Sequence, residues 1–108
     1  MVKCYLLLAD GFETVEALTP VDILRRFSLD IKMVSITDSL NVTSSHGVTV
    51  TADMLLDNSV KKGDLLILPG GYPGYENLRN DTRVIELVQN YFFDESVLLQ
   101  FVAPPLFY

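Results

Sequence analysis

Two acidic residues, Glu13 and Glu16, stand where a predicted strand gives way to a predicted helix. Acidic side chains near a helix N-terminus are stabilised by the helix dipole, which is a sufficient reason for many of them. Glu16 also adjoins the apolar stripe of that helix. A carboxyl group in this place would be partly desolvated and could exchange a proton with a neighbouring thiol. The sequence therefore allows two interpretations of Glu16. It either stabilises the N-terminus of the helix or acts as a catalytic acid or base.

Residues 69–74 are rich in glycine and directly follow a predicted strand. Glycines allow the backbone to turn sharply and to aim amide N–H groups at an anion. The segment lacks the Lys-Ser/Thr ending of a phosphate loop, and its glycine spacing differs from the dinucleotide-binding fingerprint. Gly70 and Gly71 fit an oxyanion-binding turn and a plain tight turn equally well.

The single His and the single Cys are weaker candidates for chemistry. His46 stands beside Gly47 in a predicted turn, where a solvent-facing or turn-capping role is favoured. Cys4 lies at the edge of a predicted buried strand, so we expect a small inert hydrophobe and not a reactive thiol. One Cys excludes an internal disulfide and a cysteine zinc site. No cofactor or metal ion is predicted.

Short apolar runs at residues 4–9, 31–36, 65–68 and 97–102 predict buried strands, and residues 41–52 predict a hairpin. A helix is predicted over residues 13–27, with a stripe made of Val15, Leu18, Val21, Leu24 and Phe27. A second is predicted from residue 81 or 82 to about 92, with a face made of Val84, Leu87, Val88 and Tyr91. This order predicts one α/β domain with a mainly parallel sheet, whose chemistry gathers at the carboxyl ends of the strands.

Composition excludes several classes of partner. The 108 residues include 14 acidic and 8 basic ones, a net charge of -6, so the chain lacks the basic stripe that nucleic acid requires. No apolar run is long enough to cross a membrane, and the first residues are too short for a signal peptide. With a lone Cys, the reducing cytoplasm is the predicted compartment.

Three segments resemble the ThiJ/PfpI superfamily, in particular the group around the parkinsonism-associated protein deglycase and its bacterial relatives. They are residues 9–26 (ADGFETVEALTPVDILRR), 42–53 (VTSSHGVTVTAD) and 68–74 (LPGGYPG). The resemblance is continuous from residue 2 to about residue 94. It implies a flavodoxin-like sandwich, also called class I glutamine amidotransferase-like, that is usually a homodimer.

The resemblance also implies a site. A reactive Cys would stand on a strand-to-helix elbow, Glu16 would be its acidic partner, and the amides of Gly70 and Gly71 would hold an oxyanion. Proteins of this group are described as glyoxalase- or deglycase-type enzymes that act on small dicarbonyl adducts, and as oxidative-stress proteins or chaperones.

The chain departs from this pattern where the nucleophile should stand. The family's elbow reads like Ala-Ala-Ile-Cys-Ala-Ala-Pro, whereas residues 98–104 read Leu-Leu-Gln-Phe-Val-Ala-Pro. With Pro104 aligned to the family's Pro, Phe101 takes the Cys position, and a phenyl ring cannot act as a nucleophile. We therefore expect residues 1–94 to be the amino-terminal part of a ThiJ/PfpI domain, residues 95–108 to be an aberrant apolar tail, and the chain to be inactive.

The genetic code provides a hypothesis for this tail. Shifted back by one base, Gln followed by Phe encodes only Ile or Val, and Phe followed by Val encodes only Cys or Arg. A single G restored after the codon of Asp94 permits Asp-Gly-Lys-Cys-Ala-Ala-Ala-Ile-Cys-Gly-Ala-Pro, which is the family elbow. Residues 95–108 would then be a frameshifted ending, a hypothesis that the nucleotide sequence around codon 95 tests.

Three interpretations of the chain follow. It is the incomplete amino-terminal portion of a Cys-dependent enzyme, a non-catalytic binding or dimerising domain, or a product without function. Its apolar residues 97–108 are predicted to leave one side of the sheet poorly covered, and exposed apolar patches mark interfaces or aggregation sites. Self-association beyond a monomer is therefore predicted.

Overall fold

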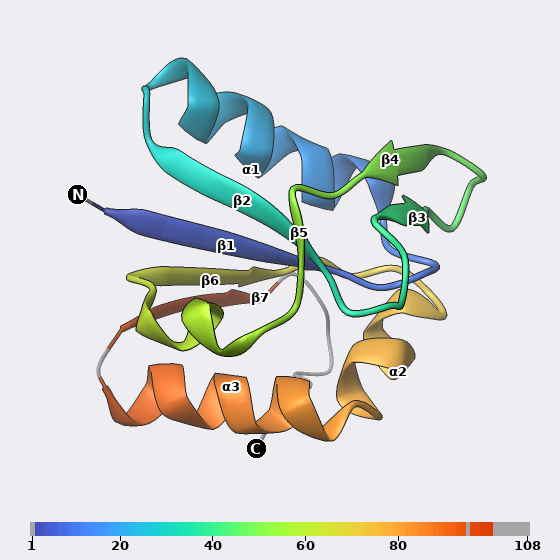
Figure 1. Cartoon of the computed structure of the whole chain (residues 1–108). Coiled ribbons are helices and arrows are strands. Elements are labelled where there is room, and N and C mark those ends of the chain that lie inside the picture. The colour runs from blue at the N-terminus through green and yellow to red at the C-terminus, as the bar shows by residue number, and fades with distance from the viewer. Residues whose placement is uncertain (1, 95, 101–108) are drawn as a thin grey trace.

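The centre of the molecule is a five-stranded parallel sheet (Figure 1). The computed structural model describes residues 2–94 and 96–100. The strand order is β5-β2-β1-β6-β7, and every pairing is parallel. The strands are β1 (Lys3–Leu8), β2 (Asp30–Ser35), β5 (Met54–Leu55), β6 (Leu65–Leu68) and β7 (Val97–Gln100). The predicted α/β class with a mainly parallel sheet is confirmed, and the run β2-β1-β6-β7 is the order of flavodoxin-like folds.

Helices cover both faces of this sheet (Figure 1). One face carries α1 (Thr14–Arg26) and the predicted hairpin, which consists of β3 (Asn41–Thr43) and β4 (Thr49–Thr51) in antiparallel pairing. The other carries the 3-10 helix η1 (Asn58–Lys62), α2 (Gly74–Arg79) and α3 (Thr82–Phe93). The sheet thus separates two apolar cores, and burial of both faces is the usual arrangement for parallel strands.

The predicted stripe of α1 is only partly correct. Val21 is buried, but Val15 is 66% exposed and Phe27 is 75% exposed. Residues three positions apart advance by less than one helical turn of 3.6 residues, so a long series with that spacing winds around the helix. The buried face instead contains Ala17 together with Val21, four residues apart.

The other predicted elements are present, and three short ones were missed. All four residues predicted for the inner face of α3 are buried, namely Val84, Leu87, Val88 and Tyr91. The missed elements are β5, η1 and α2, which have two, five and six residues. Such short elements produce too few repeats for a periodic pattern to be read from the sequence.

The predicted tail is described only in part. Its residues 96–100 belong to the described chain, and four of them form β7 at one edge of the sheet. Residue 95 and residues 101–108 lie outside the described residues. The prediction for Phe101 therefore falls beyond the structure.

Candidate functional site

Two loops meet at the carboxyl ends of the neighbouring strands β1 and β6 (Figure 1). The chain leaves β1 toward α1 on one face of the sheet and leaves β6 toward α2 on the other. Such a reversal is the topological switch point, where open α/β sheets bind their ligands. The loops are residues 9–13 and 69–73, which contain the candidates Glu13, Gly70 and Gly71, whereas Glu16 lies just beyond the first loop in α1.

Backbone hydrogen bonds hold these loops against each other. The Glu13 N–H donates to the Gly70 carbonyl oxygen at 2.8 Å, and the Gly74 N–H donates to the Gly11 carbonyl oxygen at 3.2 Å. Gly71 has φ +94°, and a Cβ there would lie 2.4 Å from the Glu13 nitrogen. Only glycine permits both this backbone conformation and this close approach. The glycines therefore allow the two loops to touch along their main chains.

Glu16 lies in the first turn of α1 and reaches across to the second loop. Its Oε1 accepts a hydrogen bond of 2.8 Å from the N–H of Gly70, which is 54 residues away in sequence. The side chain is half-buried, and no described residue donates to its other oxygen, Oε2. One carboxylate oxygen thus fixes the orientation of the group, while the second can take or give a proton.

The two predicted oxyanion amides have different surroundings. The N–H of Gly70 is occupied by Glu16. The N–H of Gly71 has no acceptor among the described residues. Gly71 can therefore offer its amide to a ligand, whereas Gly70 positions the acidic side chain. Oxyanion binding itself stays a prediction.

The strand that leads to position 101 ends beside this site. In the register of β6 and β7, Leu68 is paired with Gln100. The carboxyl end of β7 therefore reaches the edge of the sheet at which the residue 69–73 loop and Glu16 lie. Because Phe101 lies outside the described residues, its side chain is not placed relative to Glu16.

Cys4 and His46 are placed as the sequence predicted. Cys4 lies near the amino end of β1, at the end remote from the loops, and is 2% exposed. Burial, with further contributions from Asp64 and Asp30, raises the pKa of its thiol above the ordinary value, so the reactive thiolate is disfavoured. His46 is exposed in the turn between β3 and β4, where its Nδ1 lies 3.1 Å from the Ser45 hydroxyl oxygen.

The hairpin supports the first loop, a role that sequence reasoning missed. The Gly11 N–H donates to the Thr43 carbonyl oxygen, and the Ser45 N–H donates to the Phe12 carbonyl oxygen, both at 2.8 Å. The Thr43 N–H in turn donates to Asp10 Oδ1 at 3.1 Å. No pattern in the sequence indicates that two segments about thirty residues apart are in contact. These hydrogen bonds could therefore not be predicted from the sequence.

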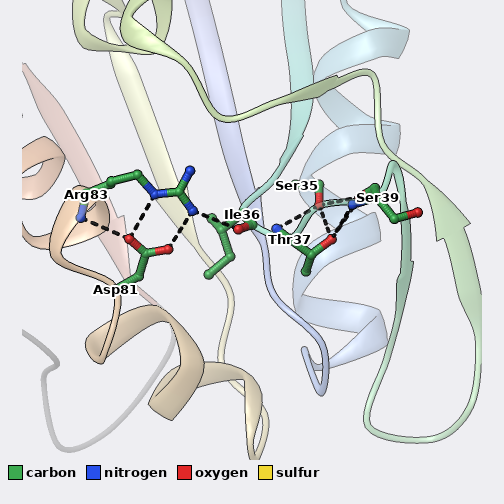
Figure 2. A network of polar contacts seen from close by, with 6 residues as sticks. All are labelled: Ser35, Ile36, Thr37, Ser39, Asp81 and Arg83. Atoms are coloured by element: carbon green, nitrogen blue, oxygen red, sulfur yellow. Dashed lines mark hydrogen bonds and ion pairs between the residues drawn. The ribbon is translucent and has the colours of Figure 1, made fainter.

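A second polar network lies at the carboxyl end of β2 (Figure 2). The buried Ser35 hydroxyl donates to the Ser39 carbonyl oxygen at 2.7 Å, and Arg83 Nη2 donates to the Ile36 carbonyl oxygen at 2.8 Å. Arg83 also pairs with Asp81 at 2.7 Å. Burial alone would raise the pKa of Asp81, but hydrogen bonds and the charge of Arg83 outweigh it and lower that pKa. The network ties α3 to β2, and its polar groups are occupied by one another.

Two kinds of feature are absent from the described part of the chain. Within residues 2–94 and 96–100, no group of three or more His, Cys, Asp or Glu side chains is placed to hold a metal ion. No described helix is long and apolar enough to cross a membrane.

Comparison with known proteins identifies the family. The DJ-1/PfpI family model matches residues 2–100. DJ-1 homolog B of Arabidopsis thaliana is 39% identical over 79 residues, which is 72% of this chain and 18% of that protein. The Parkinson disease protein 7 homolog of Danio rerio is 30% identical over 90 residues, which is 82% of this chain and 48% of that protein.

Solved structures agree with the sequence comparison. A DJ-1 superfamily protein of Salmonella typhimurium superposes with a TM-score of 0.87 and 33% identity, over 93% of this chain and 55% of that one. Oxidized DJ-1 of Toxoplasma gondii superposes with a TM-score of 0.90 and 29% identity, over 97% and 58%. The chain spans about half the length of these structures. By its sequence and its fold, this chain belongs to the DJ-1/PfpI family.

Proposed function

We propose that this chain contributes the acid-bearing part of a Cys-dependent DJ-1/PfpI site that acts on small dicarbonyl adducts, a glyoxalase- or deglycase-type activity. The observation that carries the proposal is the hydrogen bond between Glu16 and the Gly70 N–H at the topological switch point. It holds a carboxyl group whose second oxygen accepts no hydrogen bond from the described residues. This group lies at the end of the sheet where β6 and β7 have their carboxyl ends.

The chemistry assigned to each group follows from its position. A Cys thiol at the end of β7 would pass its proton to Glu16, and the thiolate would add to the carbonyl carbon of the substrate. The carbonyl π electrons then move to its oxygen, and the Gly71 N–H would donate a hydrogen bond to that oxyanion. The chain as written has Phe101 where the resemblance requires Cys, so we propose that it is inactive by itself.

Methylglyoxal consumption tests this proposal. The assay compares the 108-residue chain with a version in which one G is inserted after the codon of Asp94. We expect turnover only with the inserted base, and a loss of at least about a hundredfold when Glu16→Gln is added, since a positioned acid or base contributes roughly 10²–10⁴-fold. Turnover by the 108-residue chain would contradict the proposed inactivity. Full activity of the Glu16→Gln version would contradict the role of Glu16.

A second candidate function is a non-catalytic binding domain of the cytoplasm that self-associates or acts like a chaperone. It is favoured by large apolar side chains left exposed near the end of the described chain, which are Phe92, Phe93, Val97 and Leu99. Light scattering tests it, because we expect a homodimer or a higher assembly. A monodisperse monomer would contradict self-association and leave the enzymatic candidate unaffected.

A further inference from the structure

The peptide unit between Asp10 and Gly11 is held from two sides. Its carbonyl oxygen, on Asp10, accepts a hydrogen bond of 2.8 Å from Nδ2 of Asn77 in α2. Its N–H, on Gly11, donates to the Thr43 carbonyl oxygen of the hairpin, also at 2.8 Å. The N–H and C=O groups of a trans peptide point in opposite directions, and α2 and the hairpin lie on opposite faces of the sheet (Figure 1). The two elements therefore fix the start of the first loop, residues 9–13, between them.

The same helix is joined to the second loop, residues 69–73. The Tyr75 N–H donates to the Gly71 carbonyl oxygen at 2.9 Å. The Asn77 N–H donates to the Pro73 carbonyl oxygen, also at 2.9 Å. The main chain of Asn77 is thus bonded to the second loop, and its side chain to the first. Backbone donors are present at almost every residue, whereas the bond to the Asp10 carbonyl oxygen requires the side-chain amide of an Asn at this position.

The place of the first loop determines the orientation of both groups proposed to act in the site. The Glu13 N–H donates at 2.8 Å to the Gly70 carbonyl oxygen, which belongs to the same peptide unit as the Gly71 N–H. That bond therefore sets the direction in which the Gly71 N–H points. Glu13 is also the N-cap of α1, whose first turn contains Glu16. A shift of the first loop would move the Glu16 carboxylate and the Gly71 N–H relative to each other.

We propose that Asn77 is a positioning residue for this site. Its side-chain amide holds the Asp10 carbonyl oxygen and thereby fixes the spacing between Glu16 and the Gly71 N–H. The contacts close a ring, which runs from Asn77 to Asp10, along the first loop to α1, across the Glu16 hydrogen bond to the second loop, and back to α2. The inference rests on the proposed function for the roles of Glu16 and Gly71, whereas the ring itself can be tested without substrate.

A substitution of equal size removes only this hydrogen bond. Asn77→Asp keeps the shape of the side chain but replaces the amide N–H₂ with a carboxylate oxygen, which cannot donate to the Asp10 carbonyl oxygen. Asn80→Asp is the matched control, because it introduces the same charge at the end of the same helix, at an exposed residue outside the ring. A difference between the two variants therefore reports the lost bond and not the added charge.

Hydrogen exchange of the 108-residue chain, followed residue by residue with NMR, tests the ring in the absence of substrate. We expect Asn77→Asp to speed exchange of the Gly70 N–H, which is bonded to Glu16, by about two- to tenfold, the range that corresponds to the loss of one hydrogen bond. Amides in the centre of β1 should keep their rates, and Asn80→Asp should leave the Gly70 rate unchanged. An unchanged Gly70 rate in Asn77→Asp overturns the inference. An equal acceleration at β1, or in both variants, overturns it too, because it would show a general loss of stability.

Methylglyoxal kinetics of the version with the inserted base separate positioning from substrate binding. We expect Asn77→Asp to lower kcat by about tenfold or more with KM within about twofold, since a misplacement of roughly 1 Å can cost about 10²-fold and a group that acts only in the transition state affects kcat. A rise in KM alone overturns the positioning role. A version with the inserted base that shows no turnover contradicts the proposed function, and the exchange result then decides the inference. If Asn77→Asp does not fold, Asn77→Ala removes the same donor, favours the helix and replaces it in both measurements.

Discussion

The neighbouring strands β6 and β7 pair in one sheet, but they differ in how well the polarity of each side chain matches its burial. Three of the four residues of β6 are buried, and all four are apolar. In β7 the apolar Val97 and Leu99 are exposed, while the Gln100 amide nitrogen is buried with no hydrogen-bond partner among the described residues. A burial pattern that opposes the side-chain chemistry is a conflict between local sequence and fold.

The contrast separates β7 from its neighbour in the sheet. β6 and the inner face of α3 match their surroundings, whereas β7 keeps the parallel pairing but leaves Val97 and Leu99 exposed. This is the expected pattern for the frameshift hypothesis, because a shifted frame changes every side chain from residue 95 onward. The strand location, in contrast, is determined by the rest of the sheet.

The largest expected effect comes from shortening one leucine in each strand to alanine, which tests this contrast directly. Leu66 is fully buried in β6, so Leu66→Ala should lower the free energy of unfolding by about 2–5 kcal/mol through lost burial and a cavity. Leu99→Ala should cost less than about 1 kcal/mol, because much of that side chain is already in water. Urea unfolding followed by circular dichroism measures both. Equal losses would show that β7 is packed as well as β6.

The second prediction concerns Gln100, the polar residue at the end of β7. Gln100→Leu removes an amide nitrogen that is buried and has no partner among the described residues, so the free energy of unfolding should rise by about 1–3 kcal/mol. Gln89→Leu, on the exposed side of α3, serves as the control and should change stability by less than about 0.5 kcal/mol. A destabilising Gln100→Leu would mean that the amide is satisfied and that β7 fits its place after all.

The third prediction tests the fit of residues 2–94 at a loop. Gly71→Ala meets both a left-handed backbone, φ +94°, and the Glu13 nitrogen at 2.4 Å, so it should cost about 1–3 kcal/mol. Gly47→Ala has a similar φ of +82° but nothing within 4 Å, so it should cost about 1 kcal/mol from the backbone alone. The difference between the two measures the close contact of the loops. If it is absent, the loops are not held together as the structure describes.

Continuous apolar runs made the main strands predictable from the sequence, and the face of α3 followed from its helical spacing. The stripe of α1 was wrong at its ends because a three-residue spacing drifts around the helix. Pattern alone singled out Glu16, Gly70 and Gly71 as candidates with two interpretations each, and only the family resemblance joined them into one site, which stays a prediction. The contact from Glu16 to Gly70 was not predictable, since it depends on the sheet placing β6 beside β1.

The smallest expected effect concerns Asp81, the residue before α3, whose Oδ1 accepts a hydrogen bond from the Arg83 N–H at 2.9 Å. The pKa of Asp81 is lowered in the folded chain despite burial, because the hydrogen bonds and charge of Arg83 favour the carboxylate. A lowered folded pKa contributes stability above the unfolded value near 3.9, and that stability is lost as pH falls through the folded pKa.

Asp81→Asn keeps an amide oxygen able to cap the helix but removes the charge. It should therefore lower the free energy of unfolding by about 0.5 kcal/mol at pH 7, the scale of a charge at a helix N-terminus, and by progressively less as the acid range is entered. Glu86→Gln, exposed within α3, controls for the change in net charge. Urea unfolding measured from pH 7 down to pH 3 provides the comparison. A difference between Asp81→Asn and the unmodified chain that stays constant over that range would show that the carboxylate charge does not hold α3 to the well-fitted part of the fold.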